Sequence, residues 1–110
     1  MGSAFTGFFT NSEDFFKEVN SVGAKVNELS WQLPCSDYHK RLVSPKHCDL
    51  TNNSGKSEAS ASQAAAFLRS FVEEGVVWAH LDIGGTADLH GDVTGWGTRL
   101  LIEYARSKSQ

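Results

Sequence analysis

The segment 76–83 carries the side chains of this chain that come nearest to catalytic chemistry. His80 and Asp82 are two positions apart, so in an extended strand they project from the same face. An imidazole beside a carboxylate can bind a metal ion or transfer protons. The same spacing also arises when a buried histidine and aspartate are satisfied by neighbouring groups, and this is the interpretation that we favour. The pair by itself does not define a site.

The same segment ends in Asp-Ile-Gly-Gly-Thr, residues 82–86. Ligands of open α/β sheets bind at the carboxyl ends of strands, and the glycines at 84 and 85 allow the backbone to approach a ligand closely. The string is similar to the phosphate loop of sugar kinases with an actin-like fold. In those kinases it opens the chain and a long domain follows, whereas 24 residues, 87–110, follow Thr86. We therefore rank nucleotide binding as the third hypothesis.

Four further residues have the chemistry of zinc ligands. Cys35 and His39 are spaced to share one helical turn, but His47 and Cys48 are adjacent and would point in opposite directions from a strand. We therefore expect two free thiols and surface histidines rather than a four-coordinate zinc site. The pattern of two cysteines without secretory features indicates a reducing compartment.

Motifs for phosphate binding and serine hydrolysis are incomplete. Gly55-Lys56-Ser57 lacks the first glycine of a P-loop, because Leu50 stands at that position. Gly95-Trp96-Gly97 lacks the third glycine of a dinucleotide loop and is expected to form a turn at a helix start. The sequence contains no Gly-x-Ser-x-Gly nucleophile elbow.

The elements that must position these residues alternate between strands and helices. Hydrophobic periodicity and capping residues predict strands at 4–10, 29–33, 48–51 and 76–83, and helices at 12–26, 36–42, 58–74 and from about 98 onward. Within the first helix, Phe15, Val19, Val22 and Val26 form one apolar stripe, and Asn11 or Ser12 is expected to cap it. The continuous apolar character of 76–83 predicts the central strand. This order indicates an α/β layered sheet with helices on both faces, in a single domain spanning 1–110.

Composition excludes several classes of function. Ten Lys and Arg against thirteen Asp and Glu give a net charge of −3, so a basic nucleic-acid surface is not expected. The longest apolar run, residues 64–68, is far shorter than the roughly 20 residues that span a bilayer. The amino-terminal residues lack the basic start of a signal peptide. We expect a cytoplasmic protein that contacts neither nucleic acid nor membrane.

Two strings in the carboxyl-terminal part of the chain carry a more specific signal. Residues 78–87, Trp-Ala-His-Leu-Asp-Ile-Gly-Gly-Thr-Ala, followed by 94–101, Thr-Gly-Trp-Gly-Thr-Arg-Leu-Leu, resemble the closing segment of the leucyl (cytosol) aminopeptidase family. The strings at 7–11, 48–52 and 64–68 resemble further family segments in the same order. The resemblance covers nearly all of the chain and implies the C-terminal part of a zinc-peptidase-like catalytic domain.

The resemblance implies a metallopeptidase that removes N-terminal residues, preferably leucine, from peptides. In the family two divalent metal ions, zinc or manganese, polarise the scissile carbonyl and supply a hydroxide, and the enzyme is a hexamer. The family holds its metals with a lysine and carboxylates that include an Asn-Thr-Asp-Ala-Glu-Gly-Arg motif, which this sequence lacks. None of the thirteen carboxylates matches a metal ligand of the family. The resemblance therefore implies no catalytic or metal-binding residue here and no metal on this chain alone.

The substrate pocket is the part of the family site to which the resemblance assigns residues. Gly84 and Ala87 match positions that line the pocket for the first side chain of the substrate, and Gly85 and Thr86 shape the turn between them. Two departures from the family pattern occur elsewhere in the sequence: Ser60 stands where the family has glycine, and Cys48 where it has alanine.

Two hypotheses about function follow from the resemblance and rank above nucleotide binding. The first is that the chain is the C-terminal portion of a leucyl-type metalloaminopeptidase, contributing part of the pocket and scaffold, and inactive alone. The second is a non-catalytic interaction module derived from the family, which binds partners through surfaces that an intact catalytic domain would cover.

Overall fold

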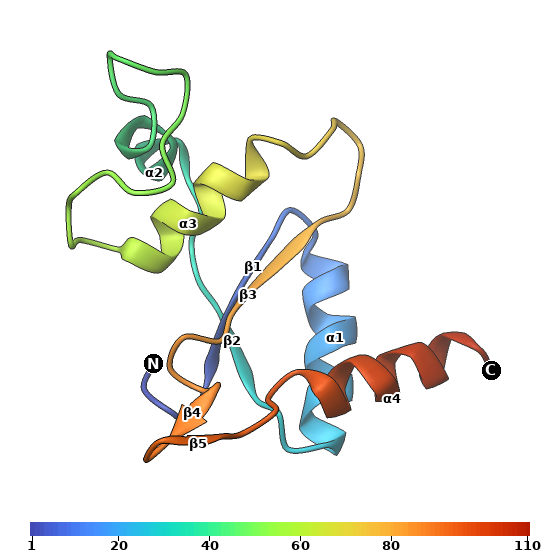
Figure 1. The fold of residues 1–110 in the computed structure, drawn as a ribbon. Coiled ribbons are helices and arrows are strands. Elements are labelled where there is room, and N and C mark those ends of the chain that lie inside the picture. The colour runs from blue at the N-terminus through green and yellow to red at the C-terminus, as the bar shows by residue number, and fades with distance from the viewer.

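A three-stranded mixed sheet forms the centre of the structure, a computed structural model that describes residues 1–110 (Figure 1). Strand β1 (Thr6–Thr10) is the middle strand, with β2 (Ser30–Gln32) parallel to it on one side and β3 (Ala79–Asp82) antiparallel on the other. The prediction that 76–83 forms the central strand is therefore wrong. β3 is an edge strand, and the predicted flanking residues Val76 and Val77 are exposed.

Helix α1 (Glu13–Lys25) connects β1 to β2 and covers one face of the sheet. The Ser12 hydroxyl accepts a hydrogen bond from the Phe15 amide at 3.2 Å, as the sequence predicts for an N-cap. The predicted apolar stripe is also confirmed, since Val19 and Val22 are buried in the core and its other members pack against them.

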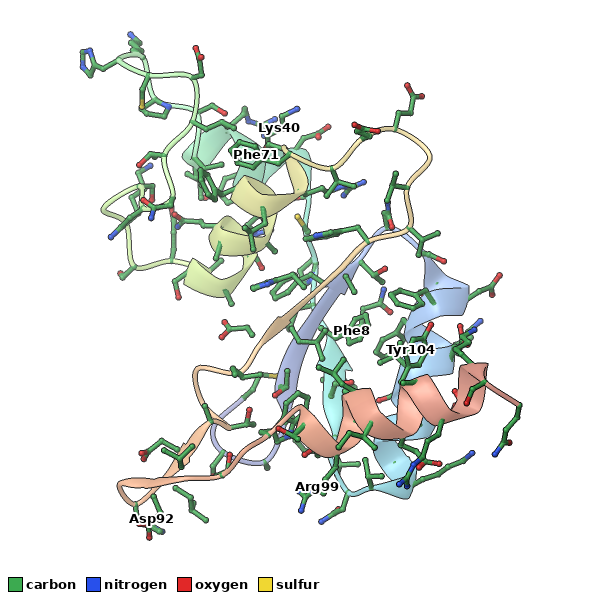
Figure 2. All side chains as sticks on the ribbon, turned by 45° about the vertical axis from the view of Figure 1, so that its right-hand side comes forward. Phe8, Lys40, Phe71, Asp92, Arg99 and Tyr104 are labelled. Carbon is green, nitrogen blue, oxygen red and sulfur yellow. The ribbon has the colours of Figure 1, made fainter.

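Helix α4 (Thr98–Lys108) packs beside α1 on that face. Phe8 from β1 and Leu100 from α4 complete the core with the two valines of α1. Figure 2 shows Phe8 and Tyr104 on the side of the sheet that these two helices cover. Phe9, the next residue of β1, points to the opposite face because side chains alternate along a strand.

The opposite face is covered by α3 (Ser60–Arg69), with α2 (Asp37–Leu42) packed on the outside of α3 (Figure 1). The predicted layered α/β sheet with helices on both faces is thus confirmed. Helix α3 is shorter than the predicted 58–74: it starts after Ala59, which has a positive φ of 48°, and its C-cap is Ser70. Ser70 donates its hydroxyl to the Ala66 carbonyl, and Phe71 beyond it is 68% exposed, so no surface supports further turns.

Two other expectations about local structure are wrong. No strand forms at 48–51, where the Thr51 amide makes one isolated bond to the Val43 carbonyl at 2.8 Å. Conversely, a hairpin of β4 (Asp88–Leu89) and β5 (Asp92–Val93) forms in a segment for which the sequence predicts no strand. Its two turn residues, His90 and Gly91, have φ values of 55° and 88°, as a tight type I′ turn requires.

The molecule is open for its size. Its radius of gyration is 15.0 Å, whereas a compact domain of this length has about 13 Å. Only 17 of the 110 residues are buried, and both edges of the sheet, at β2 and β3, lack a neighbouring strand. None of the helices is both long and apolar enough to cross a membrane.

Candidate functional site

The turn at residues 84–87 lies just after β3 and is the element to which the family resemblance assigns substrate contacts. The amides of Thr86 and Ala87 both donate to the carbonyl of Ile83, at 3.0 and 2.8 Å. At its start, the Asp82 carboxylate accepts a hydrogen bond from the Gly84 amide at 3.0 Å. The backbone of the turn is therefore held by local bonds at both of its ends.

Two threonines outside the turn, Thr6 of β1 and Thr94 just after β5, hold it in place. The Thr86 hydroxyl is buried and lies 2.7 Å from the hydroxyl of Thr6 on β1. Thr94 donates its hydroxyl to the Thr86 carbonyl at 2.6 Å and its amide to the Ala87 carbonyl at 2.9 Å. Sequence reasoning did not single out Thr6 or Thr94, because these partners are 80 and 8 residues from Thr86 and share no local motif with it.

A small pocket of about 160 Å³ lies beside this turn on the face that α3 covers. Gly85 and Asp82 line it, together with Gly7 of β1 and Ala61 of α3. Of the four predicted substrate-contact residues, only Gly85 lines this pocket; Gly84 is exposed, Thr86 is buried and Ala87 is half-buried. A dry cavity of about 150 Å³ holds a benzene-sized molecule, so the volume suffices for a branched four-carbon side chain.

Gly85 has a clear steric reason to be glycine. A Cβ added there would overlap the carbonyl oxygen of Gly2, in the amino-terminal segment that lines the same pocket. A Cβ added at Gly84 would meet only the Asp82 carboxylate, at 3.1 Å. The two adjacent glycines therefore tolerate substitution differently.

His80 and Asp82 lie on the same face of β3, as their spacing predicts. His80 stacks on Phe9, its partner across the strand pair, with ring centroids 5.8 Å apart. Burial lowers the pKa of His80, and the nearby Asp82 carboxylate opposes this shift without cancelling it. The imidazole is thus favoured in its neutral form, and the Asp82 carboxylate is engaged by the turn.

The donor groups of this chain do not fit the pair of metal ions expected for the family. No three His, Cys, Asp or Glu side chains lie close enough together to hold a metal ion. The carboxylate of Glu28, which is fully buried, is occupied by the start of α4: it accepts bonds from the Gly97 amide at 3.0 Å and the Leu100 amide at 2.8 Å. The structure thus offers pocket-lining groups at residues 82–87 but no assembled set of metal ligands.

Glu28 is a structural residue that sequence reasoning missed. Gly97, the N-cap of α4, confirms the prediction that Gly95-Trp96-Gly97 forms a turn at a helix start. A glycine N-cap has no side-chain acceptor for the free amides of the first turn, so an acceptor must come from elsewhere. That need was the available signal, but it did not indicate which of the thirteen carboxylates supplies the acceptor.

These features define a segment of an α/β domain whose candidate site lies at the end of a strand. The chain belongs to the cytosol aminopeptidase family: the model of the family's catalytic domain matches residues 1–102. It corresponds to the C-terminal part of that domain.

Individual relatives agree with this assignment. A probable cytosol aminopeptidase of Bdellovibrio bacteriovorus is 34% identical over 108 residues, which are 98% of this chain and 20% of that protein. One from Rickettsia canadensis is 32% identical over 114 residues, covering 96% of this chain and 23% of that protein. The chain therefore spans about a fifth of the length of the curated relatives that it matches.

Solved structures with the same fold come from the bottromycin maturation enzyme BotP. The match to BotP in complex with Mn covers 98% of this chain and 25% of the BotP chain, with a TM-score of 0.86 and 29% sequence identity. The match to a second BotP structure covers 99% of this chain and 26% of the BotP chain, with a TM-score of 0.89 and 30% sequence identity. The fold therefore agrees with the family assignment over nearly the whole chain.

Proposed function

We propose that this chain forms one wall of the substrate pocket in a metalloaminopeptidase that removes N-terminal amino acids, leucine preferably, from peptides. The observation that carries the proposal is the turn at 84–87, which is tied to Thr6 of β1 and to Thr94 just after β5 and presents Gly85 to a pocket of leucine size. A pocket wall needs small residues where a side chain must enter. In this role Gly85 lines the pocket, Gly84 and Ala87 flank it within the turn, and Thr86 fixes the turn.

The proposed enzyme uses two divalent metal ions, zinc or manganese, which polarise the scissile carbonyl and supply the nucleophile when bound. Because this chain offers no matching set of ligands, we propose that they belong to another part of the catalytic polypeptide and that residues 1–110 alone are inactive. The proposed enzyme is also hexameric and cytoplasmic. The open shape of the chain, with two unpaired sheet edges, supports its place within a larger domain.

A chimaera tests this role directly. Residues 1–102 replace the matching segment of the Bdellovibrio bacteriovorus relative, and hydrolysis of leucine amide and glycine amide is measured with manganese supplied. We expect the chimaera to hydrolyse leucine amide and the isolated chain not to do so. Gly85→Ala in the chimaera should raise KM for leucine amide at least tenfold and for glycine amide much less, because the added Cβ overlaps the Gly2 carbonyl oxygen and forces the pocket wall to shift.

Gly84→Ala is the matched control, since its Cβ meets only the end of the Asp82 side chain. Equal kinetic effects of Gly84→Ala and Gly85→Ala would refute the pocket assignment. Hydrolysis of leucine amide at an enzyme-like rate by the isolated chain would show that the proposed location of the metal site is wrong.

A second candidate function is a non-catalytic interaction module, and one observation favours it. An apolar groove of about 430 Å³ runs along the β2 edge, and Trp31 within it is 63% exposed. Large exposed apolar patches mark interaction surfaces. Sedimentation of the isolated chain separates the two functions: a stable monomer supports the module, and concentration-dependent association supports a part of a larger enzyme.

A further inference from the structure

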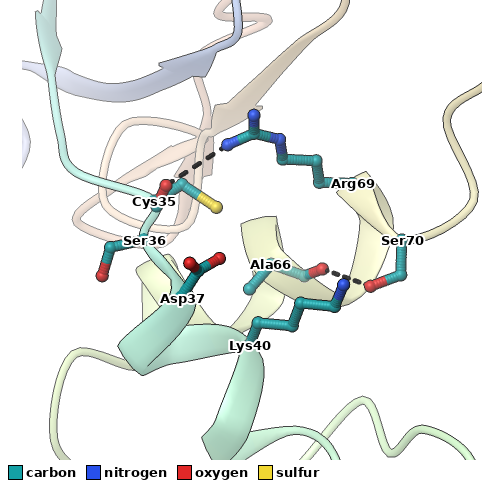
Figure 3. Close-up of a pocket in the computed structure, with 7 residues that line it drawn as sticks. All are labelled: Cys35, Ser36, Asp37, Lys40, Ala66, Arg69 and Ser70. Carbon is teal, nitrogen blue, oxygen red and sulfur yellow. Dashed lines mark hydrogen bonds between the residues drawn. The ribbon is translucent and has the colours of Figure 1, made fainter. Parts of the chain in front are cut away.

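An open pocket of about 460 Å³ lies between α2 and α3, away from the turn at 84–87 (Figure 3). Its volume falls within the range of small-molecule sites, about 300–1,000 Å³. Cys35 and Ser36, which precede α2, and Asp37 and Lys40 of α2 line one side, and α3 with its C-cap Ser70 lines the other. This pocket plays no part in the function proposed above.

Three charged side chains of this pocket have no partner of opposite charge. Lys40 and Asp37 extend from α2 and Arg69 from α3, and the three ion pairs of the molecule all lie elsewhere. Figure 3 shows all three side chains around the same space, with the Lys40 ammonium on the side of α3. The Arg69 guanidinium is anchored by a hydrogen bond of 3.3 Å to the Cys35 carbonyl and also interacts with the Cys35 thiol, and it has further N–H groups that can bind a ligand.

The other lining groups are small and mostly polar. The Ser70 hydroxyl donates to the Ala66 carbonyl at 2.9 Å, so its oxygen remains available as an acceptor. The apolar part of the lining is limited to Ala66 and the Cys35 thiol, whose pKa is raised by burial. A ligand that fits this lining is small, has one anionic and one cationic group, and carries a short side chain.

We propose that the pocket between α2 and α3 binds a free α-amino acid with a small side chain. Its carboxylate lies between Arg69 and Lys40, since a guanidinium can donate two parallel hydrogen bonds to a carboxylate. Its ammonium group binds the Asp37 carboxylate, and its side chain packs on Ala66. The two cations of the pocket complement the carboxylate of the ligand, and Asp37 complements its ammonium group. A simple anion would leave Asp37 without a partner of opposite charge.

Calorimetric titration of the 110-residue chain with three related probes tests the charge complementarity. The probes are L-alanine, propionate, which lacks the ammonium group, and alaninamide, which lacks the carboxylate. We expect saturable binding of L-alanine that is at least tenfold tighter than binding of either analogue. Equal affinities for L-alanine and propionate would overturn the proposal and reduce the pocket to a general anion site.

Substitutions in the pocket locate the binding. Arg69→Gln should weaken L-alanine binding at least tenfold and remove the preference over alaninamide, whereas Asp37→Asn should remove the preference over propionate. Arg41→Gln and Asp49→Asn are matched controls, because both residues are exposed and lie outside the pocket. Unchanged affinity in Arg69→Gln and Asp37→Asn would overturn the assignment.

Alkylation of Cys35 gives an independent measure of occupancy. In a Cys48→Ser chain, the rate at which iodoacetamide modifies Cys35 should fall at least fivefold with saturating L-alanine and stay unchanged with alaninamide. Gly85→Ala should leave both binding and protection intact, which separates this pocket from the one in the proposed function. A rate that L-alanine does not change would place any binding elsewhere and overturn the proposal.

Discussion

Replacement of Glu28 by alanine should destabilise the fold by about 2–6 kcal/mol, because the amides of Gly97 and Leu100 both lose their acceptor at about 1–3 kcal/mol each. The Glu28 carboxylate is fully buried, and one of its oxygens accepts the amides of Gly97 and Leu100 at 3.0 and 2.8 Å. A hydrogen bond to a charged group contributes about 1.5–3 kcal/mol, and a negative charge at a helix N-terminus adds about 0.3–1 kcal/mol or more when buried. Arg99, which also bonds Glu28, is 64% exposed and contributes at most about 1 kcal/mol.

Three variants separate these contributions in urea unfolding monitored by tryptophan fluorescence. Glu28→Gln keeps one acceptor oxygen for the two amides, loses the charge and turns an NH2 donor toward the Arg99 Nε–H, so we expect a loss of about 1–2 kcal/mol. Arg99→Ala should cost less than about 1 kcal/mol. The total stability of a chain of this length is about 5–15 kcal/mol, so Glu28→Ala removes a large part of it. A loss below 1 kcal/mol for Glu28→Ala, or equal losses for the alanine and glutamine variants, would refute the capping role.

Three further predictions concern stability. Burial lowers the pKa of His80 in the folded state, so the unfolded chain binds more protons than the folded chain as the pH falls toward 5. The unfolding free energy measured in urea should therefore decrease from pH 7 to pH 5. His80→Gln should make this decrease smaller. Gly23→Ala should cost several kcal/mol of unfolding free energy, since the added Cβ would lie 2.5 Å from the Glu28 carbonyl oxygen; a loss under 1 kcal/mol would show that the backbone yields. Thr86→Val leaves the buried Thr6 hydroxyl without its partner and should cost about 1–3 kcal/mol, whereas adding Thr6→Val should restore part of the loss; strictly additive losses in this double-mutant cycle would contradict the pairing.

Local signals in the sequence predict helix α1 well because both of its determinants lie within the segment. The Ser12 cap acts on an amide three residues away, and the apolar stripe repeats within the helix itself. Helix α3 shows where this reasoning stops. Its apolar periodicity continues past Arg69, but Phe71 is 68% exposed and packs only edge-on against Phe67, so no neighbouring surface stabilises another turn.

The candidate site likewise has features that depend on local sequence and features that depend on distant residues. The turn at 84–87 is visible in the sequence through its glycines and through the resemblance to the aminopeptidase family. Its attachment is not, because the Thr86 hydroxyl pairs with a residue 80 positions away. The hairpin turn at His90 and Gly91 was a missed local signal, since glycine at the second turn position accommodates the positive φ that a type I′ turn needs.

The error about the central strand has a physical cause that bears on the proposed function. The apolar run 76–83 predicts burial on both faces, yet β3 lies at the sheet edge, and Val76 and Val77 are 49% and 58% exposed. Apolar side chains are selected for the surfaces they contact in the complete protein, and this chain spans about a fifth of the length of its curated relatives. In the larger catalytic domain proposed above, the run 76–83 and the β2 groove at Trp31 are surfaces that other parts of the domain would cover. The apolar pattern of 76–83 then reflects contacts that the 110 residues do not supply by themselves.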